Sequence, residues 1–133
     1  MAVRFLDSSE LHLYGSSLAR WVAINRAHME LQNGPVERVI GVPGPILLCD
    51  GLQGVQSADN AERMAWRAWP GDRVSVKKIL GEALMAAAAW QCAAAVDGVA
   101  RKAYVAAHVS VPGTNQQAIA ARFACAGKFY EEF

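Results

Sequence analysis

The sequence predicts a single α/β domain over residues 1–133, with helices packed on a small sheet of about three strands; an α+β arrangement is the alternative. Three observations lead to this class. The stretch Ala83–Ala95 holds eight alanines in thirteen residues, which favours a helix that other elements can approach closely. Residues 103–111 alternate between two faces, as a β-strand does. A strand, a crossover helix and a second strand in this order favour a right-handed parallel unit.

The N-terminal part is predicted to be a long helix followed by two short strands. Asp7 and Glu10 have the spacing of a capping box, and the apolar residues after them recur at helical intervals. We therefore expect a helix over Ser8–Gln32. Strands are expected over Val36–Val42 and Ile46–Cys49, and a turn with two prolines separates them.

The second half is predicted to contain helices, a strand and a final helix. In chain order we expect a polar loop at Asp50–Asn60, a short helix at Ala61–Trp69, the alanine-rich helix at Ser75–Val96 and a strand at Ala103–Val111. The strand has one well-buried face of alanines and valines, and His108 lies on the other. A C-terminal helix follows, capped by Thr114 or Asn115, because apolar residues from Ile119 to Phe133 recur at spacings of three and four.

Composition limits the classes of function. Hydrophobic residues make up 53% of the chain and charged residues 19%, and much of the apolar excess is alanine. Apolar surface left over on a small domain often lies in a subunit interface, so we expect a homo-oligomer, with a dimer favoured. The formal net charge of +1 provides no global field to attract nucleic acid or an anionic membrane.

Cysteine spacing and hydropathy indicate the compartment. Cys49, Cys92 and Cys125 are odd in number and widely separated, so neither a zinc site nor a disulfide framework is expected. The longest uncharged apolar run, Ala83–Val96, is too short and too rich in alanine for a membrane span. The N-terminus has no signal-peptide pattern. We expect a cytoplasmic protein, or one inside a viral particle, with no membrane contact, metal or cofactor.

A basic segment with tryptophans, Glu62–Lys78, is the first candidate site. Basic side chains neutralise phosphates and indole rings stack on bases, so this composition is typical of nucleic-acid contact. Alternatively, the tryptophans are core or interface anchors and the arginines extend to solvent. Two cations just before the late strand could extend the surface. The residues assigned to nucleic-acid or partner contact are Arg63, Trp66, Arg67, Trp69, Arg73, Lys77, Lys78, Arg101 and Lys102.

The second candidate is a small-molecule pocket near Cys49, Asp50 and His108. Cys49 and Asp50 end a predicted strand, and open α/β sheets bind ligands at that end. Cys49 with His108 could form a nucleophile and its base; a small buried cysteine and a half-exposed strand histidine are the alternative. The Gly-x-x-Gly pattern at Gly51–Gly54 could hold a phosphate, although this pattern alone is unspecific.

One arrangement of motifs resembles a known family. A long helix, Asp-Gly-Val at 97–99, an alternating strand, Pro-Gly at 112–113 and a helix ending in Phe-Tyr-Glu-Glu-Phe follow one another over Ser75–Phe133. This order resembles the second half of Rid-type imine deaminase domains. The resemblance implies a small-molecule enzyme with its pocket between subunits. In that family a further strand carries the carboxylate-binding arginine, and the chain ends before any such strand, so no catalytic residue is implied here.

Taken together, these observations favour a non-catalytic module that self-associates, as a bacterial or viral accessory or assembly factor would. Contact with RNA or DNA through the basic segment would extend this function. A small-molecule enzyme with an inter-subunit pocket, of the Rid-like deaminase type, is the alternative, and a purely structural oligomer is a third reading.

Overall fold

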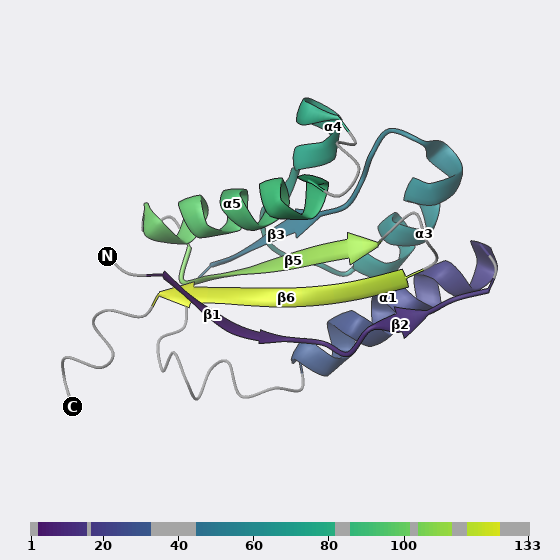
Figure 1. Ribbon diagram of the computed structural model, residues 1–133, viewed down its shortest axis with the longest axis horizontal. Coiled ribbons are helices and arrows are strands. Elements are labelled where there is room, and N and C mark those ends of the chain that lie inside the picture. The colour runs from purple at the N-terminus through teal and green to yellow at the C-terminus, as the bar shows by residue number, and fades with distance from the viewer. Residues whose placement is uncertain are drawn as a thin grey trace.

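The computed structural model describes residues 3–15, 17–32, 45–81, 86–101, 104–112 and 117–125. The fold is α/β: a six-stranded mixed sheet has α1 and α3 on one face and α5 on the other (Figure 1). The helices are α1 (Ser17–Gln32), α3 (Gln56–Trp66), α4 (Val76–Leu80) and α5 (Ala87–Ala100). The strands are β1 (Val3–Ser8), β2 (His12–Leu13), β3 (Ile46–Asp50), β4 (Arg73–Ser75), β5 (Ala106–Pro112) and β6 (Gln117–Cys125).

The strands are arranged in the order β1-β6-β5-β3-β4, and β2 pairs with the far end of β6. β3 is parallel to both of its neighbours, β4 and β5, whereas β6 runs antiparallel to β5 and β1. From β3 the chain passes through α3 on one face of the sheet to β4. It then returns through α4 and through α5, on the other face, to β5 on the opposite side of β3. In open α/β sheets of this kind, ligands bind beyond the carboxyl ends of the strands where the direction of winding changes.

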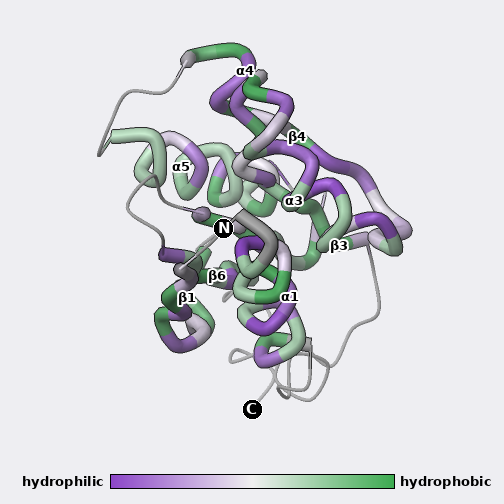
Figure 2. Tube along the Cα trace, turned by 90° about the vertical axis from the view of Figure 1, so that its right-hand side faces the viewer, coloured by the Kyte–Doolittle hydropathy of each residue, from purple (hydrophilic) through white to green (hydrophobic). Residues whose placement is uncertain are grey.

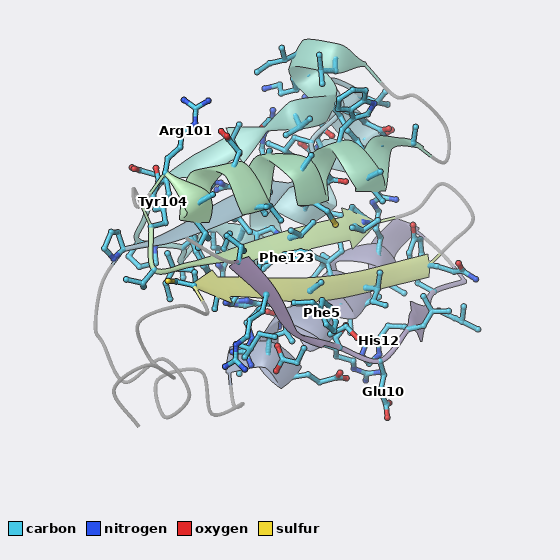
Figure 3. The ribbon with its side chains drawn as sticks, turned by 60° about the vertical axis from the view of Figure 1, so that its left-hand side comes forward. Phe5, Glu10, His12, Arg101, Tyr104 and Phe123 are labelled. Atoms are coloured by element: carbon cyan, nitrogen blue, oxygen red, sulfur yellow. The ribbon has the colours of Figure 1, made fainter. Side chains whose placement is uncertain are left out.

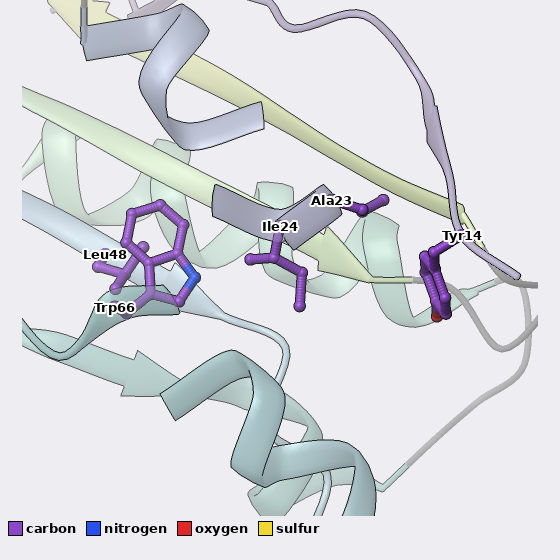
Figure 4. Packing of buried hydrophobic residues seen from close by; sticks show 6 residues of the cluster. Tyr14, Ala23, Ile24, Leu48 and Trp66 are labelled. Atoms are coloured by element: carbon purple, nitrogen blue, oxygen red, sulfur yellow. The ribbon is translucent and has the colours of Figure 1, made fainter. Parts of the chain in front are cut away.

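Alternation along β3 divides the core into two layers. Leu48 packs toward α1 and α3, where it meets Ile24 and the fully buried Trp66 (Figure 4). Its neighbour Cys49 lies on the other face, in a cluster with the α5 residues Ala95 and Val99. Both faces of the central strands are thus covered, and β5 is buried at nearly every position.

The two faces of β6 are covered unequally. Its even-numbered residues are buried beneath α1, as Ala120 is against Ala27 and Leu31. Its odd-numbered residues, on the face of α5, are only half-buried. On this side the ring of Phe5 lies edge-on to Phe123, with the centroids 5.8 Å apart, and the Phe5 side chain is 57% exposed (Figure 3). The α5 layer therefore leaves apolar sheet surface uncovered.

The α/β class is confirmed, but the sheet is larger than predicted and the C-terminal helix is wrong. Residues 117–125 form β6, which pairs with β5 over seven positions. Ile119 and Phe123 are four residues apart, a spacing that puts side chains on one side of a strand as well as of a helix. The rest of the predicted helix, residues 126–133, and the predicted strand at Val36–Val42 lie outside the described residues.

The first predicted helix begins later than expected. Residues of its predicted first two turns belong to β1 and β2, and α1 starts at Ser17. Asp7 does not cap a helix, because its carboxylate accepts hydrogen bonds from the buried guanidinium of Arg122 on β6. The strand pairing with β6 and this ion pair outweigh the local capping pattern.

The remaining elements follow the predicted order with shifted ends. The strand predicted at Ile46–Cys49 is β3, and the one at Ala103–Val111 contains most of β5. The short helix begins at Gln56 instead of Ala61. The alanine-rich segment is not one continuous helix from Ser75, since that residue belongs to β4 and α4 ends at Leu80. The later helix, α5, continues past Asp97 and Gly98 to Ala100.

Gln91 of α5 ties the two central strands together. Its Nε2 donates to the carbonyl oxygen of Asp50 at 2.9 Å and to that of Ser110 at 2.7 Å, and the side chain is fully buried. Both carbonyl groups lie near the carboxyl ends of their strands, β3 and β5, where no further pairing between these strands satisfies them. A buried carbonyl without a donor costs about 1–3 kcal/mol.

We therefore expect Gln91→Met, which keeps the volume but removes the amide, to lower the free energy of unfolding by about 3 kcal/mol. Urea denaturation followed by circular dichroism measures this loss. Gln56→Met, at an exposed position of α3, is the control and should change the stability by less than about 0.5 kcal/mol. Equal effects of the two substitutions would contradict this role for Gln91.

Candidate functional site

The loop after β3 is held by buried carboxylates. The amide of Gly51 donates to Oε1 of Glu62 at 2.6 Å, and the amide of Leu52 donates to Oδ1 of Asp50 at 3.1 Å. The next two amides, those of residues 53 and 54, donate to the two carboxylate oxygens of Asp59 at 2.9 and 2.8 Å. All three carboxylates are buried. Each loop amide from Gly51 to Gly54 therefore already has an acceptor.

This arrangement argues against the phosphate-binding interpretation of Gly51–Gly54. A phosphate needs free amide donors, and here the chain's own carboxylates take them. Gly51 is required for a different reason, since a Cβ at this position would lie 2.5 Å from Cδ of Pro112. The loop packs directly against the end of β5.

Four aromatic rings cluster on the α1 and α3 face of the sheet. His28 of α1 stacks edge-on against Trp66, with ring centroids 4.2 Å apart, and lies 6.0 Å from His108 of β5. Trp69 closes the cluster, with its centroid 5.1 Å from that of His108. The indole N–H of Trp66 donates to the hydroxyl of Ser110 at 3.2 Å. The cluster is packed ring against ring.

Burial keeps both histidines of this cluster neutral. Loss of hydration lowers the pKa of His28 to about 4 and, with the charge of Arg122 and then His28 adding to the effect, the pKa of His108 to about 3. The Nδ1 atoms of both rings are buried and have no hydrogen-bond partner among the described residues. The two neutral imidazoles therefore act as packed rings of the core, and we expect their protonation in acid to disrupt this packing.

The structure does not bring the predicted pocket residues together. His108 pairs with Leu48 in the sheet and faces α1, whereas Cys49 faces α5 on the opposite side. The Cys49–His108 nucleophile pair is therefore wrong. Burial raises the pKa of the Cys49 thiol to about 12, with the charges of Asp50 and Cys92 adding to the effect, so it is a poor nucleophile. Of the three predicted residues, only Asp50 lies at the loop described above.

The basic segment is divided between the core and the surface. Trp66 is 1% exposed and cannot stack on a base, so this part of the prediction is wrong. Lys77 is buried and Trp69 is half-buried. Arg101 is exposed and its Nε donates to Asp97 at 2.9 Å, and Lys102 lies outside the described residues. The cations of this set that remain exposed near α3, β4 and α4 are Arg63, Arg67, Arg73 and Lys78.

An apolar surface on α4 and α5 was not singled out from the sequence. We call it the α4–α5 surface; its large members are Ile79, Leu80 and Trp90, which are 76%, 56% and 51% exposed. Exposed alanines at helical spacing continue it along α5 and its N-cap, with the charged Asp97 between the last two of them: Ala86, Ala89, Ala93 and Ala100. One tryptophan within an alanine-rich helix is the signal that could have indicated it.

Three comparisons with known proteins return nothing: no family model, no curated protein and no solved structure matches the chain. Within the described part of the chain, no helix has the length and apolarity needed to cross a membrane. The same residues contain no group of three or more histidine, cysteine or acidic side chains placed to hold a metal ion.

The buried histidines predict a loss of stability in acid. Their pKa values in the folded protein lie below the ordinary value of 6.5, so the unfolded chain binds more protons between about pH 6.5 and pH 4. The stabilisation is therefore present above pH 6.5 and lost as the pH falls toward 4. Urea denaturation at pH 7.5 and 5.0 should show a lower midpoint at pH 5.0.

The double substitution His28→Phe and His108→Phe keeps two rings but removes both titrating groups, so it should reduce this difference in midpoint. His12→Phe, on β2 outside the cluster, should leave most of the difference in place. A double variant with the full wild-type difference would show that other groups cause it.

Proposed function

We propose that this protein is a self-associating interaction module and that two copies meet through the α4–α5 surface. The observation that carries the proposal is the exposure of Ile79, Leu80 and Trp90 on adjacent helices. The hydrophobic end of α4 lies at the outside of the molecule (Figure 2). Large exposed apolar patches mark interaction sites in otherwise well-packed domains, and tryptophan is enriched among residues that dominate binding energy.

The side of the molecule that carries this surface is incompletely covered. A single long helix, α5, packs on a face where β6 remains half-buried and Phe5 is exposed. On the opposite face α1 and α3 together bury the even-numbered residues of β6. Apolar surface therefore continues from α5 onto the sheet, which favours association on this side over the other.

A second copy of the chain is the partner that the surface fits best. In a twofold pair of antiparallel α5 helices (Ala87–Ala100), each end meets the opposite end of its partner, so the helix dipoles oppose each other. The exposed alanines beside Trp90 would let the two backbones approach closely and leave space for the indole ring.

We expect the protein to dimerise, and Trp90→Ala to weaken the dimer at least about 30-fold, because a central tryptophan contributes about 2 kcal/mol or more to an interface. Sedimentation equilibrium over a range of concentrations measures the dissociation constant. Trp21→Ala is the matched control, since Trp21 is also partly exposed but lies on α1. Circular dichroism checks that both variants fold.

Two outcomes would contradict this assignment. A wild-type protein that stays monomeric at high concentration would remove self-association. Equal weakening by Trp21→Ala and Trp90→Ala, or weakening by Trp21→Ala alone, would place the interface elsewhere.

Contact with nucleic acid is a second candidate, carried by a smaller set of cations than predicted. Arg63, in the last turn of α3, and Arg67, at its C-cap, are exposed, and neither forms an ion pair with another described residue. Arg73 is also exposed, although its Nε lies 3.5 Å from Oδ2 of Asp50. These cations could neutralise phosphates without any base stacking, which favours sequence-independent contact.

If this contact occurs, the triple substitution of Arg63, Arg67 and Arg73 by alanine should weaken binding to single-stranded RNA about tenfold or more at low salt. The slope of log affinity against log salt should also fall, since fewer counterions are released. Fluorescence anisotropy with a labelled oligonucleotide measures both quantities. Unchanged affinity and slope would remove these three residues from any nucleic-acid surface.

A further inference from the structure

Two buried carboxyl groups meet the loop that follows β3. Glu62 is fully buried and Asp50 is 1% exposed. One oxygen of each accepts an amide of the loop, that of Gly51 for Glu62 and that of Leu52 for Asp50. The other two oxygens, Oε2 of Glu62 and Oδ2 of Asp50, are buried without a hydrogen-bond partner among the described residues. Buried oxygens that accept no hydrogen bond are costly, above all when they are charged.

The surroundings offset only part of this charge. From β4, the guanidinium of Arg73 lies 3.5 Å from Oδ2 of Asp50. From α1, Arg20 acts weakly on Glu62. Among the described residues of the other elements, β5 presents the neutral hydroxyl of Ser110 to Glu62, and α5 presents the neutral Gln91, bonded to the backbone of Asp50. On α3 itself, the carboxylate of Asp59 adds a further acidic group to the same loop.

We propose that Glu62, beside the carboxylate of Asp50, takes up a proton as the pH falls through neutrality, and that this proton holds the Asp50–Gly54 loop against α3 as a latch. With the proton bound, one of two adjacent like charges is removed and Glu62 still accepts the amide of Gly51. Without it, two buried carboxylates repel each other across the first residue of the loop. The loop then separates from α3 more readily.

Close packing makes the loop sensitive to this carboxyl group. A Cβ at Gly51 would lie 2.5 Å from Cδ of Pro112 and 3.0 Å from Oε2 of Glu62, so the backbone is pressed against both. Movement of Glu62 away from Asp50 therefore displaces Gly51 or breaks its hydrogen bond. The end of β5 at Pro112 is the other wall of this contact.

The pKa of Glu62 also indicates that the loop is held more firmly when this carboxyl group is protonated. Burial first, and then the charge of Asp50, raise its pKa to about 7, against the opposing effects of the Gly51 amide, the Ser110 hydroxyl and Arg20. Because the folded pKa exceeds the ordinary value of 4.5, the stabilisation is complete below pH 4.5 and is lost as the pH rises through 7. The latch thus closes on acidification and loosens in mild alkali, opposite to the effect of the histidine cluster.

Hydrogen exchange tests the latch on the intact chain. We compare amide protection at Gly51 through Gly54 at pH 6.0 and 8.0 by NMR, after correcting for the intrinsic rates. In the wild type, protection of these amides should fall about tenfold or more at pH 8.0, while Val99 in the core of α5 serves as the internal reference. Glu62→Gln keeps an acceptor for Gly51 but cannot titrate, so its loop protection should not depend on pH.

Asp59→Asn is the matched control. It neutralises another buried carboxylate that holds the same loop, and it should leave the pH dependence in place. Asp50→Asn, which removes the neighbouring charge, should move the midpoint to lower pH by about one unit.

The proposal is overturned if wild-type loop protection is the same at both pH values, or if Glu62→Gln retains the wild-type dependence. Should Glu62→Gln fail to fold, the side-chain carboxyl of Glu62 in the wild type can be titrated directly by ¹³C NMR. A midpoint near 7 then supports the latch, and a midpoint below 5 excludes it.

Discussion

The amide of Gln91 joins β3 and β5 where the polar loop leaves the sheet, and much of the surrounding structure depends on it. It brings the carbonyl groups of Asp50 and Ser110 onto one donor from α5. From the other face, Ser110 receives the indole N–H of Trp66 and Asp50 leads into the loop held by α3. A single buried side chain from α5 thereby connects both layers of helices through the two central parallel strands.

Buried polar groups on the α3 side give the protein two opposing responses to pH. The imidazoles of His28 and His108 are packed as neutral rings and become unfavourable in acid. The carboxyl of Glu62 is favoured in its protonated form and becomes unfavourable in alkali. Both groups belong to the contact of α1 and α3 with the central strands, so the two effects together favour a stability maximum between them.

The α5 side of the sheet is mostly apolar, and more of its apolar surface is exposed to solvent. α5 buries Ala95 and Val99 against β3 and β5 but leaves its outer alanines, Trp90 and the near face of β6 in contact with solvent. The proposed contact between copies lies on the side of α5, whereas Arg63 and Arg67, at the C-terminal end of α3, lie on the side of α1 and α3.

The sequence correctly predicts those elements whose hydrophobic pattern fits either a helix or a strand but not both. β3 and β5 are continuous apolar or alternating runs, and the alanine-rich residues of α5 are helical because alanine favours a helix without help from its neighbours. It fails where local signals have two readings. Ile119 and Phe123 fit one face of a helix or of a strand, and only the long pairing with β5 makes them part of β6. Asp7 resembles a helix cap until Arg122, distant in sequence, takes its carboxylate.

The candidate functional residues also fall into two groups, those that the sequence indicates and those that only the tertiary structure identifies. The chain by itself determines the α/β class, the cluster of cations between Glu62 and Lys78, and the small side chains of α5. Tertiary structure alone decides that Trp66 is core, that Cys49 and His108 face opposite helices, and that Glu62 lies beside Asp50. The physical reason is that burial and the face of a strand depend on which elements pack together. Those contacts join residues far apart in sequence, and no local spacing specifies them.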